Sequence, residues 1–361
     1  MDEIIKLFDP YIGKNEEKAL LQTLRSKFWA SGAGAGNVEI FEKKFCQYTK
    51  SKDCVAVNNG TSALHLALSL LDVQNKEVIV PSMSFVSTAN AVLYNGGKPV
   101  FADVDPDTLC IDPNSIKKSI TKKTAAVLPV HFGGMPCKLD EIDEICSKHH
   151  LALVEDAAHA AGATYKKKRI GGYGDAVCFS FHPVKNLAMP TGGAVTLNGK
   201  QSSKNATAIK TRRWCGISNR KGAVYDISEL GWNFYMNEFS AAIGIVQLAK
   251  LDSMNSKRKK IAKRYFDEIR LAEKMPYVTE CSYHIYWIQV KNRSKFMSYM
   301  EKNNIQTGIH YLPIHKMSFY NSTKKLPITE NISKNIVSIP IHPNMTDYDV
   351  TKIIKLVNHY N

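Results

Sequence analysis

The sequence predicts an α/β protein with a mainly parallel central sheet, helices on both faces of that sheet, and a smaller C-terminal α/β domain. Three observations predict this fold class. Between residues 52 and 200, short Val-rich runs alternate with helical patterns, as in parallel sheets whose strands are joined by helices. The runs are almost continuously apolar, which is typical of strands buried on both faces. Residues 236–270 then read as one long helix or two in series, and short strand-like and helical pieces follow Pro276.

The expected elements follow one another in a regular order. The strands are Cys54–Val57, Glu77–Pro81, Pro99–Val104, Ala125–Phe132, Leu151–Asp156, Ala176–Phe181 and Gly193–Leu197. The helical patterns between them are Ser62–Leu71, Val86–Tyr94 and Leu139–His149. We expect a large domain at residues 1–250 and a small one at residues 251–361. Ligands of such sheets bind beyond the carboxyl ends of the strands, so functional residues are expected there.

The composition is that of an ordinary soluble protein, with 44% hydrophobic and 22% charged residues among 361. Acidic residues stand at positions 2 and 3, no signal-type apolar run follows, and no stretch approaches the roughly 20 residues that span a bilayer. We therefore expect a cytoplasmic protein with no membrane partner. The eight cysteines are scattered without a C-x-x-C pair, which predicts reduced, mostly buried thiols and no metal site.

The net charge of +15 raises the possibility of a nucleic-acid partner. The basic residues, however, form dispersed patches without interleaved aromatic residues, and the run Lys257–Lys260 belongs to a helical pattern, which favours a solvated helix face. We therefore expect no nucleic-acid partner. A positive surface still attracts small anionic substrates such as nucleotide diphosphates.

Two sites at strand ends are candidates for ligand chemistry. At Gly60-Thr61-Ser62 a strand gives way to a helix, and the backbone N–H groups with two hydroxyls would form a phosphate cradle. A plain N-cap by Thr61 or Ser62 explains this pattern equally well. Asp156 ends a buried strand and needs a cation or several donors, for which a protonated pyridine nitrogen is suitable. Its alternative role is to cap a following helix.

Lys185 is the third candidate. It is reached directly from a buried strand, in a turn closed by Gly192 and Gly193, so it is poorly placed for a solvated surface charge. Desolvation lowers the pKa of a lysine and makes it a nucleophile toward carbonyls. Ser180, at the end of the same strand, would reach the same phosphate as Thr61 and Ser62.

These residues belong to motifs that together resemble one known family. The motifs are Gly60-Thr61-Ser62-Ala63-Leu64, Val80–Phe85, Glu155–His159, Ser180–Leu187, Gly231–Glu238, Thr307–His315 and Ile339–Pro343. In this order they resemble the DegT/DnrJ/EryC1/StrS family, which are sugar aminotransferases with the pyridoxal-phosphate (PLP) fold type I of aspartate aminotransferase. The resemblance covers nearly the whole chain.

The resemblance implies a role in cofactor binding for several residues. Lys185 would form the Schiff base with PLP and then move the proton, and Asp156 would pair with the pyridinium nitrogen. His159 would face the phenolic oxygen of PLP, and Phe85 would stack on its ring, unless Phe85 is ordinary core. The phosphate would be bound by Gly60, Thr61, Ser62 and Ser180, and by Asn233 of a neighbouring subunit, which implies a homodimer with shared active sites.

The resemblance also implies that Ser31, Gly32, His310, Tyr311 and His315 approach the substrate, although the two histidines can equally be structural. Two departures from the family pattern, at Ala188–Thr191 and at Tyr235, lie near the substrate in relatives and limit any transfer of substrate preference.

The implied function is transfer of an amino group from L-glutamate to a nucleotide-linked keto-sugar, with pyridoxamine phosphate as the intermediate form of the cofactor. Relatives that are dehydratases carry a histidine in place of the lysine, so Lys185 argues against that chemistry. Two alternatives remain open: an aminotransferase of the same family acting on a cyclitol or another keto substrate, and a basic binding protein on an inactive aminotransferase fold.

Overall fold

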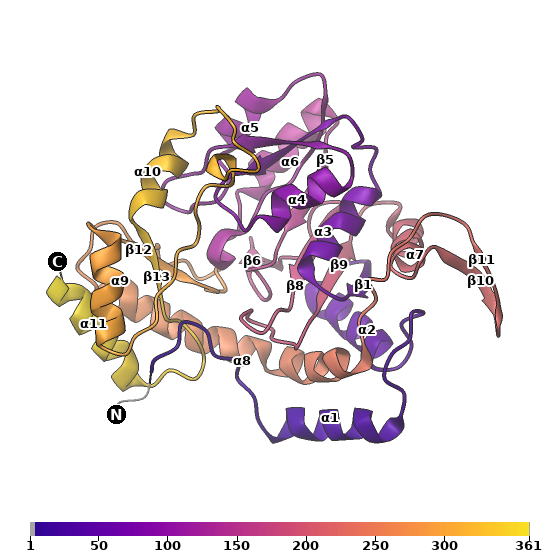
Figure 1. The fold of residues 1–361 in the computed structure, drawn as a ribbon, viewed down its shortest axis with the longest axis horizontal. Coiled ribbons are helices and arrows are strands. Elements are labelled where there is room, and N and C mark those ends of the chain that lie inside the picture. Colours follow the sequence, from indigo (N-terminus) through magenta and orange to yellow (C-terminus); the bar gives the residue numbers. More distant parts are fainter. Residues whose placement is uncertain (1–3, 361) are drawn as a thin grey trace.

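The computed structural model describes residues 4–360 and contains one central sheet covered by helices on both faces (Figure 1). The strands of this sheet are β1 (Asp53–Val57), β2 (Glu77–Pro81), β3 (Lys98–Ala102), β4 (Thr124–Val127), β5 (Ala152–Asp156), β8 (Ala176–Ser180) and β9 (Gly193–Leu197). Their order across the sheet is β1-β9-β8-β5-β4-β2-β3. β9 is antiparallel to both of its neighbours, and the other pairings are parallel. The expected fold class is confirmed.

Alternate side chains of each strand enter two different cores. In β1, Val55 and Val57 pack in one core, and Cys54 and Ala56 pack in the other. The helices of the large part are α2 (Asn37–Thr49), α3 (Gly60–Ser69), α4 (Ser87–Tyr94), α5 (Pro113–Ser119), α6 (Leu139–His149) and α7 (Ser202–Arg212). α3, α4 and α7 contribute to one core, whereas α2, α5 and α6 contribute to the other. Burial on both faces explains why the strands are apolar throughout.

The strand expected at Ala125–Phe132 is shorter than predicted, because β4 ends at Val127. Pro129 has no N–H to donate to a ladder, and the chain then turns through η1 (Phe132–Gly134), where Gly133 has a φ of 62°. The segment still runs beside β5, since the N–H of Asp156 donates to the Pro129 carbonyl at 2.9 Å.

The C-terminal part contains the pair β12 (Tyr286–Gln289) and β13 (Ile336–Ile339) with surrounding helices. These helices are α9 (Arg293–Lys302), η2 (Ile314–Lys316), α10 (Pro327–Asn335) and α11 (Asp347–Tyr360). The long helix α8 (Glu238–Glu268) joins the two parts, and α1 (Lys14–Ser26) packs against it (Figure 1). α8 runs without a break through residue 250, so the domain boundary expected there, which stays a prediction, lies inside a helix.

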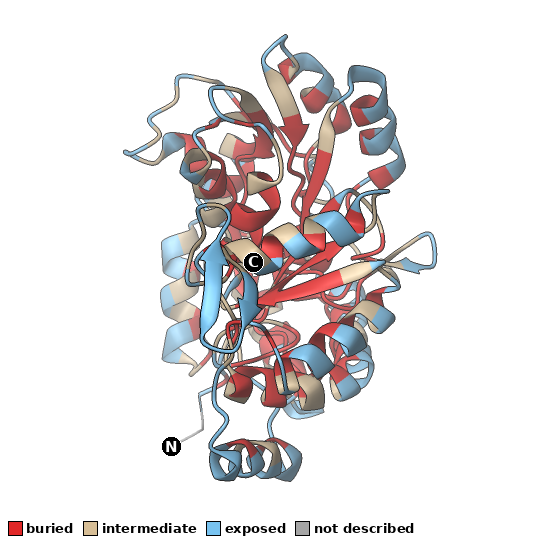
Figure 2. Cartoon of the chain, turned by 90° about the vertical axis from the view of Figure 1, so that its right-hand side faces the viewer, coloured by how far each residue is buried: buried red, intermediate tan, exposed pale blue. Residues whose placement is uncertain are grey.

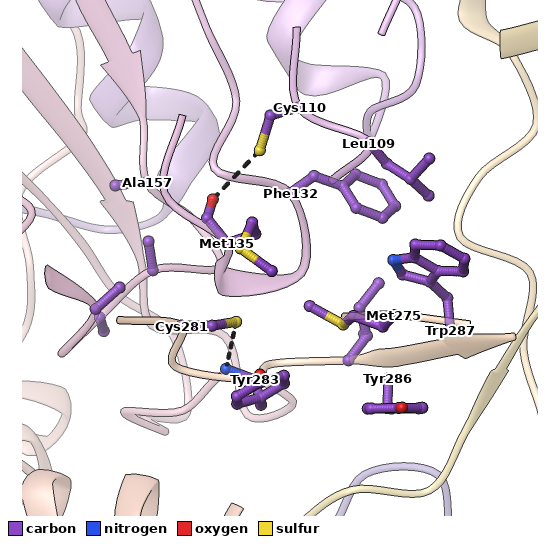
Figure 3. Close-up of a cluster of buried hydrophobic side chains, with 14 of the residues drawn as sticks. Leu109, Cys110, Phe132, Met135, Ala157, Met275, Cys281, Tyr283, Tyr286 and Trp287 are labelled. Carbon is purple, nitrogen blue, oxygen red and sulfur yellow. Dashed lines mark hydrogen bonds between the residues drawn. The ribbon is translucent and has the colours of Figure 1, made fainter. Parts of the chain in front are cut away.

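One core continues across both parts of the chain. Figure 3 shows Phe132 and Met135 of the large part facing Met275, Tyr283 and Trp287 of the C-terminal part, all of them buried. This packing places the loop before β12 close to the loops that follow β4 and β5. The large part and the C-terminal part of the chain therefore meet beside the carboxyl ends of β4 and β5.

Two hairpins lie outside the sheet. β6 (Thr164–Tyr165) and β7 (Lys168–Arg169) form a short one, and β10 (Ile217–Lys221) and β11 (Val224–Ile227) form a longer one. The β10–β11 hairpin projects from the body of the protein and is exposed along most of its length (Figures 1 and 2). All eight cysteines are unpaired, and six of them are buried, as the sequence predicted. Among residues 4–360, no helix is both long enough and apolar enough to cross a membrane.

Candidate active site

A cavity of about 430 Å³ lies at the carboxyl ends of β1, β5 and β8. Of the residues predicted from sequence, its wall contains Gly60, Thr61, Phe85, Asp156, His159, Ser180, Lys185, His310 and Tyr311. A larger groove of about 730 Å³ beside Trp287 is lined by prolines and charged residues, and it contains none of the residues predicted from sequence. We call the first one the central cavity. Its size is within the range of sites that bind cofactors.

Lys185 lies in the turn that follows β8. Its backbone N–H donates to the His182 carbonyl at 2.8 Å. The next residue, Asn186, anchors the turn, because its side-chain amide donates to Asn255 of α8 at 2.9 Å and to the Ser282 carbonyl at 2.8 Å. Burial lowers the pKa of Lys185 to about 8, while the carboxylate of Asp156 acts in the opposite direction. A fixed lysine with a lowered pKa is a nucleophile near neutral pH.

Asp156 ends β5 and is 4% exposed. One carboxylate oxygen accepts from the Thr88 hydroxyl at 2.8 Å, and the other accepts from the Ala158 N–H at 3.1 Å. No helix starts at the residues that follow, so the alternative of a helix cap is wrong. Burial raises the pKa of Asp156, and the positive charge of Lys185 opposes this. The cavity thus offers a buried carboxylate that a ligand cation would stabilise.

The start of α3 is capped by Asn59 rather than by Thr61 or Ser62. The Asn59 side chain accepts from the Ser62 N–H at 2.8 Å, and the Ser62 hydroxyl donates to Asn58 at 2.7 Å. Ser62 is buried and lies outside the lining of the central cavity. The hydroxyl of Thr61 lies within the lining, at 2.7 Å from the hydroxyl of Ser87.

Two glycines bring the start of α3 against β8 and β9. A Cβ added to Gly60 would lie 2.7 Å from the Cβ of Ser180, and one added to Gly193 would lie 2.5 Å from the carbonyl carbon of Asn59. The missing side chains leave a helix N-terminus beside the hydroxyls of Thr61 and Ser180. Helix N-termini attract anions, so this cradle fits a phosphate group.

His159 and Tyr311 form a neutral pair on the cavity wall. The Gly133 N–H donates to Nδ1 of His159 at 3.2 Å, so Nδ1 carries no hydrogen. Nε2 of His159 therefore carries it and donates to the Tyr311 hydroxyl at 3.1 Å. Burial lowers the pKa of His159 well below its ordinary value, so the ring is neutral. Phe85 is 57% exposed, which excludes an ordinary core role, and its ring lies 6.3 Å from that of Tyr311.

The remaining predicted residues are divided between the cavity and other places. His310 lines the cavity, and its Nδ1 lies 2.9 Å from the Ser338 hydroxyl. His315 lies outside the lining and is fully buried, with Nδ1 2.6 Å from the Ser82 hydroxyl and Nε2 3.1 Å from the Glu330 carboxylate. The first contact ties η2 to the segment after β2, and the second ties it to α10. A substrate role for His315 stays a prediction.

Ser31, Gly32 and Asn233 also lie outside the cavity lining of their own chain. A Cβ on Gly32 would fall on the ring of Trp214, and Asn233 forms a backbone bridge with the same residue. Asn233 is exposed to solvent. Exposure of this kind is required of a residue that reaches the site of a neighbouring subunit, although the role itself stays a prediction.

Several residues of the site were missed by reasoning from sequence. Asn59, Ser87 and Thr88 follow the carboxyl ends of β1 and β2, so the rule that placed Asp156 would have found them. Phe8 and His284 come from the N-terminal segment and the loop before β12, and they reach the site through tertiary packing. No local pattern marks either of them.

Three groups of the site fit the three reactive parts of PLP. The cradle at Gly60 suits its phosphate, Asp156 suits a protonated pyridine nitrogen, and Lys185 suits its aldehyde. The central cavity holds all three groups together. Within residues 4–360, no cluster of three or more His, Cys, Asp or Glu side chains is arranged to hold a metal ion.

Comparisons with known proteins agree with this chemistry. SpsC of Bacillus subtilis, a spore coat polysaccharide biosynthesis protein, is 35% identical over 96% of this chain and 95% of its own. PseC of Helicobacter pylori, an aminotransferase involved in the biosynthesis of pseudoaminic acid, has a TM-score of 0.92 and 28% identity over 99% of this chain and 98% of its own.

Spr1654 of Streptococcus pneumoniae, in its PLP form, has a TM-score of 0.93 and 26% identity over 99% of this chain and 98% of its own. The structure of its pyridoxamine-phosphate form matches with a TM-score of 0.93 as well, at 25% identity over 98% of both chains. The model of the DegT/DnrJ/EryC1/StrS aminotransferase family matches residues 10–358. The chain belongs to the DegT/DnrJ/EryC1/StrS aminotransferase family and is a PLP-dependent aminotransferase.

Proposed function

We propose that this aminotransferase moves an amino group from L-glutamate to the keto group of a nucleotide-linked sugar, giving an amino sugar. The observation that carries the proposal is the meeting of the Lys185 amine, the Asp156 carboxylate and the cradle at Gly60 in one cavity. Two relatives support the sugar, since SpsC is a polysaccharide biosynthesis protein and PseC acts in pseudoaminic acid biosynthesis.

PLP, when bound, serves as an electron sink and carries the amino group between the two substrates as pyridoxamine phosphate. Asp156 would hold the pyridine nitrogen in its protonated form, and its bonds from Thr88 and Ala158 keep the carboxylate in place. Lys185, with a pKa of about 8, would exchange a proton with the substrate carbon, because part of its amine is unprotonated near neutral pH.

Two polar groups of the cavity wall, His310 and Tyr311, suit a sugar. Burial lowers the pKa of His310 to about 4 and raises that of Tyr311 above its ordinary value, so both side chains are neutral at pH 7. Neutral donors and acceptors pair well with hydroxyl groups and do not demand a charged partner. The net charge of +15 would in addition attract the diphosphate of a nucleotide-linked substrate.

We also propose a homodimer in which Asn233 of each chain reaches the phosphate cradle of the other. The projecting β10–β11 hairpin exposes Val224, Tyr225 and Ile227 at 74%, 53% and 60%. Apolar side chains this exposed are typical of a surface that another chain covers. The eight unpaired thiols suit a reducing compartment, which supports a cytoplasmic location.

The test combines the purified protein, PLP and L-glutamate with a panel of nucleotide-linked keto-sugars and keto-cyclitols, and measures 2-oxoglutarate and the aminated product by mass spectrometry. Lys185→Ala should form neither product. If glutamate is converted but only keto-cyclitols accept the amino group, the sugar assignment is wrong and the cyclitol alternative replaces it. If wild-type protein forms no covalent link with PLP, the assignment of Lys185 is wrong.

A further inference from the structure

His284 lies beside Lys185, and no feature of the sequence pointed to it. Its Nε2 atom is 3.4 Å from Nζ of Lys185. The residue is 1% exposed and stands in the loop just before β12. The amine proposed to join PLP therefore has an imidazole of the C-terminal part of the chain within 3.4 Å.

The backbone on both sides of His284 is fixed. Its own N–H donates to the Gly133 carbonyl at 2.8 Å, and the Ser282 hydroxyl donates to the His159 carbonyl at 3.0 Å. Tyr283 is fully buried, and its N–H donates to the sulfur of Cys281 at 3.3 Å (Figure 3). The loop is thus bound to the segment after β4 and to the segment after β5.

The imidazole plane of His284 is fixed as well. The Phe8 ring stacks on it with centroids 5.3 Å apart and planes 17° from parallel, and the ring of His159 lies 4.4 Å from it. These two contacts hold the plane of the ring, and the contact between Nε2 and Nζ of Lys185 gives its orientation within that plane. Nε2 is therefore held toward the amine of Lys185.

The contacts of His284 also indicate which nitrogen carries its hydrogen. Burial, together with Lys185, His159, Arg258 and His310, lowers the pKa of His284 well below its ordinary value, so the ring is neutral. Within the described chain, Nδ1 is buried and has no hydrogen-bond partner. A buried N–H without a partner is rarer in proteins than a buried acceptor without one, so the favoured tautomer carries its hydrogen on Nε2.

We propose that His284 is a positioning residue whose Nε2–H donates to the lone pair of the Lys185 amine and holds it unprotonated whenever it is not joined to PLP. An N–H directed at Nζ can be accepted only by the neutral amine, since an ammonium group has no lone pair. At 3.4 Å the bond is long, so the amine exchanges it readily for the cofactor. The proposal rests on the assignment of Lys185 as the lysine that joins PLP.

The other groups that face Lys185 do not explain a neutral amine through charge. The carboxylate of Asp156 favours the ammonium form. His159, His182 and His310 have lowered pKa values, are neutral at pH 7, and add no positive charge. Because Nδ1 of His284 has no partner, His284 cannot pass a proton onward, and it acts by holding the amine.

The test measures how readily Lys185 reacts at different pH values in the full chain freed of PLP. The amine is acetylated with acetic anhydride over about two pH units on each side of the midpoint, and modified Lys185 is quantified by peptide mass spectrometry. The wild-type midpoint should lie at about 8. His284→Phe keeps a ring that stacks on Phe8 but removes the donor, so the midpoint should rise by about half to one pH unit. His284→Gln keeps an N–H at a similar reach and should restore most of the wild-type midpoint.

Two outcomes would overturn the proposal. A midpoint in His284→Phe that is unchanged or lower means that Nε2 does not donate to the neutral amine. Equal rises in the Phe and Gln variants mean that packing alone sets the midpoint. His149→Gln, an exposed histidine on α6, should behave as wild type, and thermal unfolding checks that each variant is folded. Failure of the Lys185 assignment would appear separately, as a link to PLP that reduction with borohydride still traps in Lys185→Ala.

Discussion

Gly60→Ala is the most direct test of the phosphate cradle. An alanine Cβ would lie 2.7 Å from the Cβ of Ser180, 3.1 Å from its Oγ and 3.2 Å from its Cα. Rotation of the Ser180 side chain relieves only the contact with Oγ. The Ser180 backbone is itself fixed, because it pairs with Gly193 in the ladder between β8 and β9. The start of α3 must therefore move away from Ser180.

The size of the effect follows from these contacts. Overpacking of this kind costs about 1–3 kcal/mol. A hydrogen bond to a charged group contributes about 1.5–3 kcal/mol, and separating α3 from Ser180 weakens at least one such bond to the phosphate of PLP. We expect the Kd of PLP to rise about 10- to 100-fold. The Tm of the PLP-free protein should fall by roughly a few degrees.

The assay is a titration of PLP-free protein with PLP, followed by visible absorption, with thermal unfolding measured in parallel. Gly199→Ala is the matched control, because its Cβ would meet only Asp175 Oδ1, at an ordinary distance of 3.6 Å. A folded Gly60→Ala protein that binds PLP with the wild-type Kd would refute the idea that α3 and Ser180 together hold the phosphate.

Three further predictions follow from other parts of the structure. Asp156→Asn should lower the rate of glutamate conversion in stopped-flow assays by about 10²-fold or more, and an unchanged rate would contradict this. The same variant should raise the Tm of the PLP-free protein at pH 7, because burial raises the pKa of Asp156 and penalises its charged form in the folded state. Replacing both Val224 and Ile227 with serine should raise the dimer dissociation constant, measured by sedimentation, about 10-fold or more, because both side chains are exposed on the hairpin. If the double variant sediments as the wild type does, the hairpin is not the dimer contact. Glu330 has its pKa lowered to about 2 by the Leu326 N–H, His315 and Lys316, so the stability that its charge provides is present above its ordinary value of 4.5 and is lost as pH falls toward 2. In urea denaturation, Glu330→Gln should be less stable than wild type at pH 7 by at most about 1 kcal/mol, since the group is partly exposed, and a difference that does not shrink below pH 4.5 would contradict the reasoning.

The periodic pattern of apolar residues in the sequence predicted most of the secondary structure. It also predicted that the site lies at the carboxyl edge of the sheet. The bounds of β2, β9 and α6 agree with the sequence interpretation, because strands buried on both faces and amphipathic helices leave a periodic signal in the chain. Parallel strands share one carboxyl edge, so Asp156 and Lys185 were expected to meet, and they do. The position of β9, antiparallel between β1 and β8, carries no comparable local signal.

The sequence by itself pointed to Lys185 and Asp156, the two groups that we propose give the chemistry, since Asp156 ends a buried strand and Lys185 lies in the turn that follows one. Only the tertiary structure decided what surrounds them. Phe8 lies 177 residues before Lys185 in the chain, and His284 lies 99 residues after it. Both reach the site through packing of the N-terminal segment and the C-terminal part. His315 shows the reverse, because its bonds to Ser82 and Glu330 turn a motif histidine away from the cavity. Side-chain partners of this kind depend on which distant segments meet, and a local pattern does not contain that information.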